Sequence, residues 1–171
     1  MRVLSELEPK NVFSFFEDIC NIPHPSYKED KISNYLVDFA KESKKLGIEL
    51  LVMDDGWFGK RSDDTTSLGD WYVNEEKLKG GLSSLIKRVN AEGLKFGIWY
   101  EPEMISPESE LFKAHPDWHV NVDGRTPMLG RNQYVLDFSR EDVRENIWEQ
   151  MYNILSENNI EYLKWDFNRN I

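Results

Sequence analysis

The feature that most constrains this chain is an alternation of short apolar segments with helical stretches from residue 46 onward. The apolar segments are rich in Ile, Leu, Val and aromatic residues, and several are apolar on both faces, as strands of a helix-covered sheet are. Alternating strands and helices indicate βαβ units, whose right-handed crossovers bring the carboxyl ends of parallel strands to one edge. The expected fold class is therefore α/β. Strands are predicted at residues 48–53, 95–100, 133–138 and 161–167.

Apolar side chains at helical spacing mark the intervening segments. Helices are predicted at residues 9–22, 30–45, 82–92 and 140–158. Gly93 is a carboxyl-terminal cap candidate, and Ser139 with Asp142 three residues later fits a capping box. The prolines of residues 22–26 predict a turn between the first two helices.

Composition excludes several classes of protein. A length of 171 residues suits one domain. The net charge is −10 and the basic residues are scattered, so we expect no nucleic-acid partner. The single cysteine, Cys20, cannot support a disulfide framework. No apolar run approaches the roughly 18 residues of a membrane span, and the first residues do not resemble a signal peptide. We therefore expect a cytoplasmic protein with no membrane partner.

Acidic residues follow the predicted strands. Asp54 and Asp55 follow the first strand, and Glu101 follows the second. Ligands of α/β folds bind beyond the carboxyl ends of strands, so these acids are expected at one rim together with Asp166. Asp54 and Asp55 also suit a simple capped turn, because Asp-Gly is a turn signal.

The last predicted strand places three polar residues on one face. Strand periodicity directs Lys164, Asp166 and Asn168 to the same side. A neighbouring cation and amide would favour the ionised form of Asp166, as a nucleophilic carboxylate requires. The alternative is an ion pair between Lys164 and Asp166 that only stabilises the sheet.

Aromatic residues near these acids fit sugar recognition, because an indole ring can cover the apolar face of a pyranose. Trp57 and Trp99 are the candidates for that contact. The other four tryptophans are expected to pack internally: Trp71, Trp118, Trp148 and Trp165. Pro116 separates His115 from His119, and no cysteine supports a metal site there, so no metal is expected.

Several ordered sequence blocks resemble the α-galactosidases of glycoside hydrolase family 36. The resemblance covers about residues 40–169. The blocks are DDGWFG (54–59), LGDW (68–71), WYEPEM (99–104), HPDW (115–118), GRNQ (130–133), LDFSR (136–140) and KWDFNR (164–169).

This resemblance implies a retaining hydrolase that releases terminal α-linked galactose from substrates such as melibiose and raffinose. It also implies a TIM-type barrel flanked by β-sandwich domains, no cofactor, and oligomers among full-length members. The nucleophile would be Asp166. The positions that match galactose-binding residues are Asp54, Asp55, Trp99, Arg131, Lys164 and Asn168.

The match corresponds to about strands two to four of the eight-stranded barrel, so we expect a partial TIM (β/α)8 barrel over residues 43–171. The helical segment 1–42 instead resembles the beginning of an aminoacyl-histidine dipeptidase, through LSELEP (4–9), IPHPS (22–26) and ISNYL (32–36). A chimeric or truncated chain would give this pattern, and the foreign helices would pack loosely.

The family's acid/base Asp is expected beyond Ile171, so this chain alone should not turn over α-galactosides. Two other hypotheses stay open. A dipeptidase fragment, from a metallopeptidase family, would depend on zinc, and a non-catalytic galactose-binding fragment would bind the sugar without cleaving it.

Overall fold

The structure is a computed structural model that describes residues 7–8, 10, 13–14, 17 and 30–168. Most of the helix predicted at 9–22 and the whole turn at 22–26 lie outside the described residues. The IPHPS block of the dipeptidase resemblance therefore has no structural test. The elements are α2 (Asp30–Lys45), β1 (Leu50–Met53), α3 (Gly81–Ala91), β2 (Lys95–Tyr100), β3 (Met104–Ile105), α4 (Glu110–Ala114), β4 (Tyr134–Val135), α5 (Glu141–Glu157) and β5 (Tyr162–Trp165).

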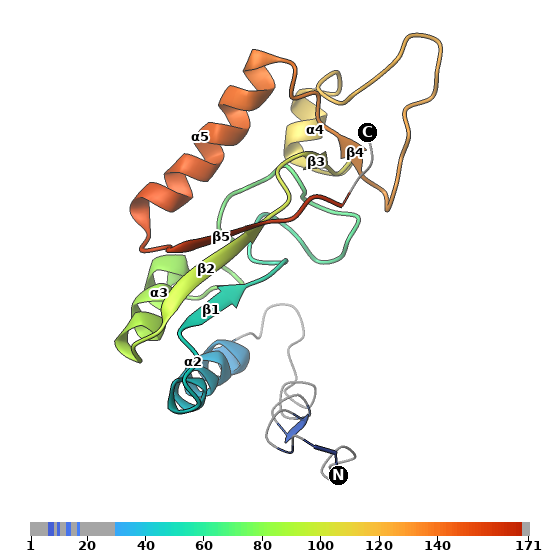
Figure 1. Ribbon diagram of the computed structural model, residues 1–171. Helices are drawn as coiled ribbons and strands as arrows, with labels where there is room; N and C mark the ends of the chain where they lie inside the picture. The colour runs from blue at the N-terminus through green and yellow to red at the C-terminus, as the bar shows by residue number, and fades with distance from the viewer. Residues whose placement is uncertain (1–6, 9, 11–12, 15–16, 18–29, 169–171) are drawn as a thin grey trace.

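Three strands form a parallel sheet in the order β1-β2-β5, as the alternating sequence pattern predicts. In Figure 1 the strands point the same way, and β3, β4 and α4 are grouped beyond their carboxyl ends. The register pairs Leu50 with Lys95 and Gly97 with Tyr162. A Cβ atom at Gly97 would lie 3.1 Å from the Tyr162 carbonyl oxygen, so this glycine permits the close approach of β2 to β5.

The central strand β2 is buried at every residue after Lys95. Its last two side chains join an aromatic block under the carboxyl end of the sheet, where ring centroids lie 4.3–6.2 Å apart. Such contacts add to the stabilisation that burial of the rings gives. This aromatic block packs beneath the polar residues that follow the carboxyl ends of the strands. Its members are Trp57, Phe58, Trp71, Trp99 and Tyr100.

The segment 133–138 is not a strand of the parallel sheet, contrary to the sequence-based prediction. Only Tyr134 and Val135 form a strand, β4, which pairs antiparallel with β3. A parallel strand next to β2 would need a crossover that returns along the sheet. The five-residue helix α4 rises only about 7.5 Å, whereas a six-residue strand spans about 20 Å. Helix α4 is therefore too short for that crossover, and after the loop that follows α4 the chain returns to pair with β3.

The helix ends also differ from the prediction in one place. Ser139 does not cap α5, because its hydroxyl donates to Asp137 Oδ1 at 2.6 Å and the helix is capped by the extended residue Arg140. Asp142 binds Arg140 rather than completing a capping box. The helix predicted at 82–92 is found as α3, and Gly93 has a left-handed φ of 80° just after it.

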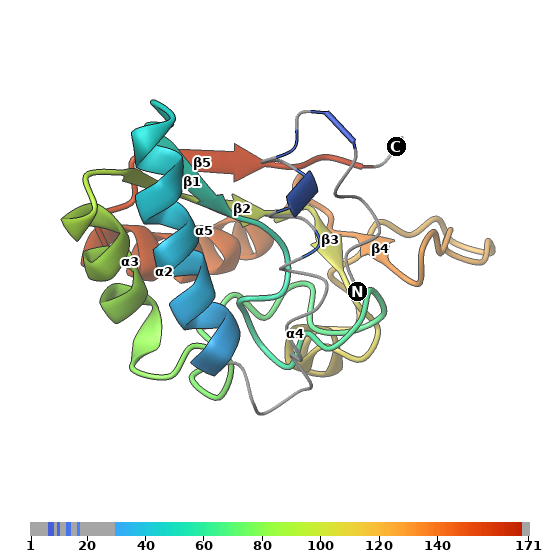
Figure 2. The ribbon, with the colours of Figure 1, turned by 90° about the horizontal axis from the view of Figure 1, so that it is seen from below.

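Helix α2 has the bounds that the sequence predicts, but it does not pack loosely. Val37 and Ala40 are buried in the common core. Arg88 of α3 donates to Asn34 at 2.8 Å, and Lys41 lies 3.6 Å from Glu92. Figure 2 shows α2 and α3 side by side. None of the described helices is long and apolar enough to cross a membrane.

Candidate active site at the carboxyl edge of the sheet

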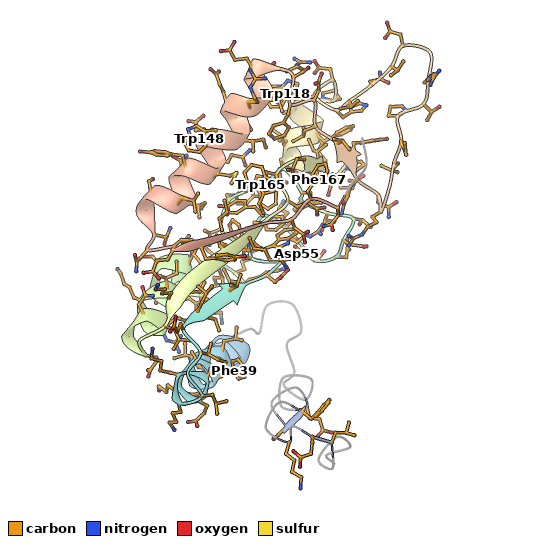
Figure 3. All side chains as sticks on the ribbon, in the orientation of Figure 1. Phe39, Asp55, Trp118, Trp148, Trp165 and Phe167 are labelled. Atoms are coloured by element: carbon orange, nitrogen blue, oxygen red, sulfur yellow. The ribbon has the colours of Figure 1, made fainter. Side chains whose placement is uncertain are left out.

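The predicted acids meet at one edge of the sheet, which confirms the expectation of a shared rim. Asp54 and Asp55 follow β1, Glu101 follows β2, and Asp166 follows β5. The Asp166 amide donates to the Tyr100 carbonyl at 2.8 Å, so the β2–β5 ladder continues into this residue. Figure 3 shows Asp55 at this end of the sheet, with Trp148 far away on α5.

Asp166 is held by the indole of Trp99. Trp99 Nε1 donates to Asp166 Oδ2 at 3.0 Å, and the Trp99 carbonyl accepts a 2.9 Å hydrogen bond from Trp57 Nε1. Only 3% of Trp99 is exposed, so its ring has little freedom. One carboxylate oxygen of Asp166 is therefore fixed by a buried donor.

The tryptophan predictions hold in part. Trp71 and Trp118 are buried, as expected. Trp57 and Trp99 are 2% and 3% exposed, so neither ring face is open to cover a sugar; Trp57 packs edge-on against Tyr100. The expectation of internal packing was wrong for Trp148 and Trp165, which are 63% and 49% exposed. Hydrophobicity alone could not place these two, because the exposed faces of a helix and an edge strand also carry apolar residues.

Lys164, on β5, forms an ion pair with Asp54, which follows β1 on the other side of β2. Lys164 Nζ lies 2.7 Å from Asp54 Oδ2. Partial burial acts to raise the pKa of Asp54, but the hydrogen bond from Lys164, the Asp55 amide and the lysine charge outweigh it and lower that pKa. Lys164 therefore pairs with Asp54, and not with Asp166 as the structural alternative required. The Asp55 amide also donates to Asp54 Oδ1 at 2.9 Å, so the predicted turn and the rim coexist.

Asn168 is bound by a buried carboxylate. Asn168 Nδ2 donates to Glu101 Oε1 at 3.0 Å, and Glu101 is 2% exposed. Burial raises the pKa of Glu101, although the Asn168 bond and the nearby charge of Arg131 act in the opposite direction. Lys164, Asp166 and Asn168 thus each have a partner at the rim, as their shared strand face predicts.

Arg131 lies in a tight turn near the same edge. Gly130 and Gln133 exchange backbone hydrogen bonds of 3.1 and 3.0 Å, and Arg131 and Asn132 between them have positive φ values of 51° and 56°. Such a conformation is uncommon for residues other than glycine and is found where the surrounding structure imposes it. Arg131 is exposed, and its charge acts on buried Glu101.

Arg61 belongs to the site but was not predicted from the sequence. Its side chain is 4% exposed and binds Asp55, with Nη2 at 2.8 Å from Oδ2 and Nε at 3.0 Å from Oδ1. Arg61 stands in an irregular loop, where no periodicity indicates which side chains are buried. Only the contact itself reveals this residue.

His115 and His119 pack against aromatic rings. His115 stacks on Trp118 with a centroid separation of 3.8 Å, and His119 stacks on Tyr134 at 4.7 Å. Across residues 30–168 and the few described residues before them, no group of three or more His, Cys, Asp or Glu side chains could hold a metal ion.

Comparison with known proteins agrees with this geometry. The family model for melibiase matches residues 26–171. The bifunctional α-galactosidase/sucrose kinase AgaSK of Mediterraneibacter gnavus is 54% identical over 142 residues, which cover 83% of this chain and 15% of that protein. The α-galactosidase AgaA of Geobacillus stearothermophilus is 54% identical over 145 residues, or 85% of this chain and 19% of that protein.

Solved structures agree as well. The crystal structure of the family 36 α-galactosidase AgaB from Geobacillus stearothermophilus superposes with a TM-score of 0.79 at 54% identity, over 85% of this chain and 20% of that one. A variant of AgaA in complex with raffinose gives a TM-score of 0.78 at 54% identity, over 81% of this chain and 19% of that one. The chain thus spans about a fifth or less of the length of these relatives. By this match over most of its residues, the chain belongs to the melibiase family.

Proposed function

We propose that this chain carries part of the catalytic site of a retaining α-galactosidase, with Asp166 as the nucleophile. The observation that carries the proposal is the position of Asp166 at the carboxyl end of β5, where one oxygen accepts from Trp99 Nε1 at 3.0 Å. That bond leaves the second oxygen, Oδ1, for attack. Family membership and the AgaA complex with raffinose support substrates with terminal α-linked galactose, of the melibiose or raffinose type.

In this proposal, a carboxylate oxygen of Asp166 attacks the anomeric carbon while the bond from that carbon to the departing oxygen breaks. The departing oxygen keeps the bonding electron pair and takes a proton from a carboxylic acid. Water then attacks the anomeric carbon, gives a proton to the conjugate base of that acid, and displaces the Asp166 carboxylate. Glu101 and Glu103 are the neighbouring acids after β2, but they already accept hydrogen bonds from Asn168 and Trp165. The family resemblance assigns the role of proton donor to neither of them.

The remaining rim residues are proposed to bind galactose. Carboxylates accept hydrogen bonds from sugar hydroxyls, and cationic or amide groups donate to them, so a mixed rim can recognise a polyol. The exposed fractions of the Lys164 and Asp54 side chains are 40% and 61%, which leaves both accessible to a ligand. The proposed binding residues are Asp54, Asp55, Arg131, Lys164 and Asn168, while the buried Trp99 acts through its hydrogen bond to Asp166.

Three further properties stay proposals. The parallel order β1-β2-β5 supports a partial TIM barrel, because strands of that barrel are parallel neighbours. A cytoplasmic location and oligomers of full-length members are proposed from composition and from the family. The division into residues 1–42 and 43–171 also stays a prediction, and the family match begins within the first part, at residue 26.

Calorimetric titration with galactose, and with glucose as the comparison sugar, tests the binding part of the proposal. We expect galactose to bind and Lys164→Met to weaken its affinity about tenfold, because a charge-assisted hydrogen bond is lost. Lys113→Met is the matched control, since Lys113 also forms an exposed ion pair, 3.2 Å from Glu110 on α4. Absence of galactose binding, or equal affinities in the two variants, would contradict the proposed site.

A further inference from the structure

The buried guanidinium of Arg61 contacts three acceptors. Its Nε and Nη2 bind the two oxygens of Asp55 at 3.0 and 2.8 Å, and its Nη1 donates to the Thr66 carbonyl at 2.7 Å. Paired donation from a planar guanidinium to both oxygens fixes the plane of a carboxylate as well as its position. An ammonium group could not reproduce this geometry.

The two partners differ sharply in exposure. The Arg61 side chain is 4% exposed, whereas that of Asp55 is 38% exposed. Arg61 therefore holds Asp55 from the protein side and does not reach solvent. A carboxylate has about four acceptor positions, so two remain for a ligand once the guanidinium is bound.

The loop that carries Asp55 and Arg61 is held by hydrogen bonds from other parts of the chain. Lys77 Nζ donates to the carbonyls of Gly56, at 3.1 Å, and of Arg61. The Gly59 amide donates to the Tyr72 carbonyl at 2.8 Å. The guanidinium also lies 5.8 Å from the centre of the Phe58 ring, which belongs to the aromatic block. Arg61 is thus supported by elements that are themselves packed.

We propose that Arg61 is a positioning residue that holds the Asp55 carboxylate in one orientation, with its free acceptor positions turned toward the rim. The expected consequence, that Asp55 binds a galactose hydroxyl, rests on the proposed function. Arg61 does not contact the sugar. It acts through Asp55 alone.

The orientation of Asp55 can be measured without any ligand. Three-bond couplings to the Asp55 carboxyl carbon report its χ1 angle in the isotope-labelled chain. We expect a single rotamer in the wild type and rotamer averaging in Arg61→Lys, which keeps the charge but not the paired donors. In the wild type, the Arg61 Nε proton should exchange slowly with water, because it is buried and hydrogen-bonded, and its resonance should move in Asp55→Asn.

The matched control is Arg140→Lys, because Arg140 also binds aspartate carboxylates but lies at the start of α5. It should leave the Asp55 couplings unchanged. A single Asp55 rotamer in folded Arg61→Lys would overturn the proposal. Fast exchange of the Arg61 Nε proton in the wild type would overturn it as well, even if the variant does not fold.

Galactose titration separates this inference from the proposed function. We expect Arg61→Lys to weaken galactose binding about tenfold or more, and to have little further effect in an Asp55→Asn background, because it acts through that carboxylate. Equal effects in both backgrounds would contradict the inference while the galactose site stands. If the wild type binds no galactose but its Asp55 rotamer depends on Arg61, the proposed function fails and the positioning contact stands.

Discussion

Two arginines that bind aspartate lie in contrasting surroundings. Arg61, at the rim of the sheet, is 4% exposed and binds Asp55 through both carboxylate oxygens. Arg140, at the start of α5, is 34% exposed and joins Asp117 and Asp142, at 2.8 and 2.7 Å. Both guanidinium groups form short hydrogen bonds, so distance does not distinguish them. Their access to water does.

This difference sets what each contact contributes. An exposed guanidinium that loses its partner is hydrated at once, so exposed ion pairs contribute little to stability. A buried group that loses its partner stays desolvated, and the cost is large. The Arg61 contact should therefore govern both stability and the geometry of the rim, whereas the Arg140 contact should only organise local surface charge.

The largest effect is expected from Arg61→Met. This change leaves the Asp55 carboxylate and the Thr66 carbonyl without their buried donors, so it should lower the free energy of unfolding by about 2–3 kcal/mol. The loss is smaller than the roughly 3–5 kcal/mol typical of a fully buried pair, because Asp55 is partly exposed. Urea denaturation measures it. The control, Arg140→Met, should have a much smaller effect, and equal losses in the two variants would refute the contrast.

A smaller loss is expected from Lys77→Met. Lys77 donates to the carbonyls of Gly56 and Arg61, and it thereby ties down the loop that carries Arg61. Removal of these bonds should cost about 1–2 kcal/mol in unfolding free energy. A loss greater than that of Arg61→Met in the same urea assay would show that the loop, rather than the guanidinium, is the main source of stability.

Salt should separate the two arginine contacts further. Screening acts on exposed charges, because the Debye length is about 3 Å at 1 M salt and about 10 Å at 0.1 M. Any stability difference between wild type and Arg140→Gln should vanish in 1 M sodium chloride. The difference between wild type and Arg61→Gln should persist, and if both differences vanish, Arg61 is not shielded from water.

The smallest effects are shifts in the pKa values of exposed carboxyls. Hydrogen bonds from Arg140 lower the pKa of Asp117 and of Asp142 from the ordinary value of 3.8. A lowered native pKa stabilises the fold above the unfolded value, and that contribution is lost as the pH falls through the native value. Carboxyl-carbon NMR titration should find both pKa values higher in Arg140→Gln. Unchanged values would contradict the role given to Arg140.

The sequence predicts the parts of this fold that repeat regularly. The helix α2 and the strand β2 have the predicted bounds, because apolar residues recur at helical spacing in the first and run almost continuously in the second. The meeting of Asp54, Glu101 and Asp166 at one edge also follows from the crossover rule.

Contacts between irregular segments could not be predicted in this way. The pairing of β4 with β3 depends on how the chain turns after Glu103, whose carbonyl accepts from the Leu136 amide at 2.7 Å. The burial of Arg61 depends on Asp55, Thr66 and Phe58 meeting in space. No spacing pattern along the chain encodes either arrangement.

The role of Asp166 as the nucleophile of a galactose site can be tested directly. The direct test is intact-mass analysis of acid-quenched mixtures of the chain with an activated aryl α-galactoside, whose good leaving group needs little protonation. We expect one galactosyl group per chain, mapped to Asp166, with release of one equivalent of phenol, and neither the adduct nor the phenol in Asp166→Asn. An adduct of equal yield in Asp166→Asn, or the absence of any adduct in a wild-type chain that binds galactose, would contradict it.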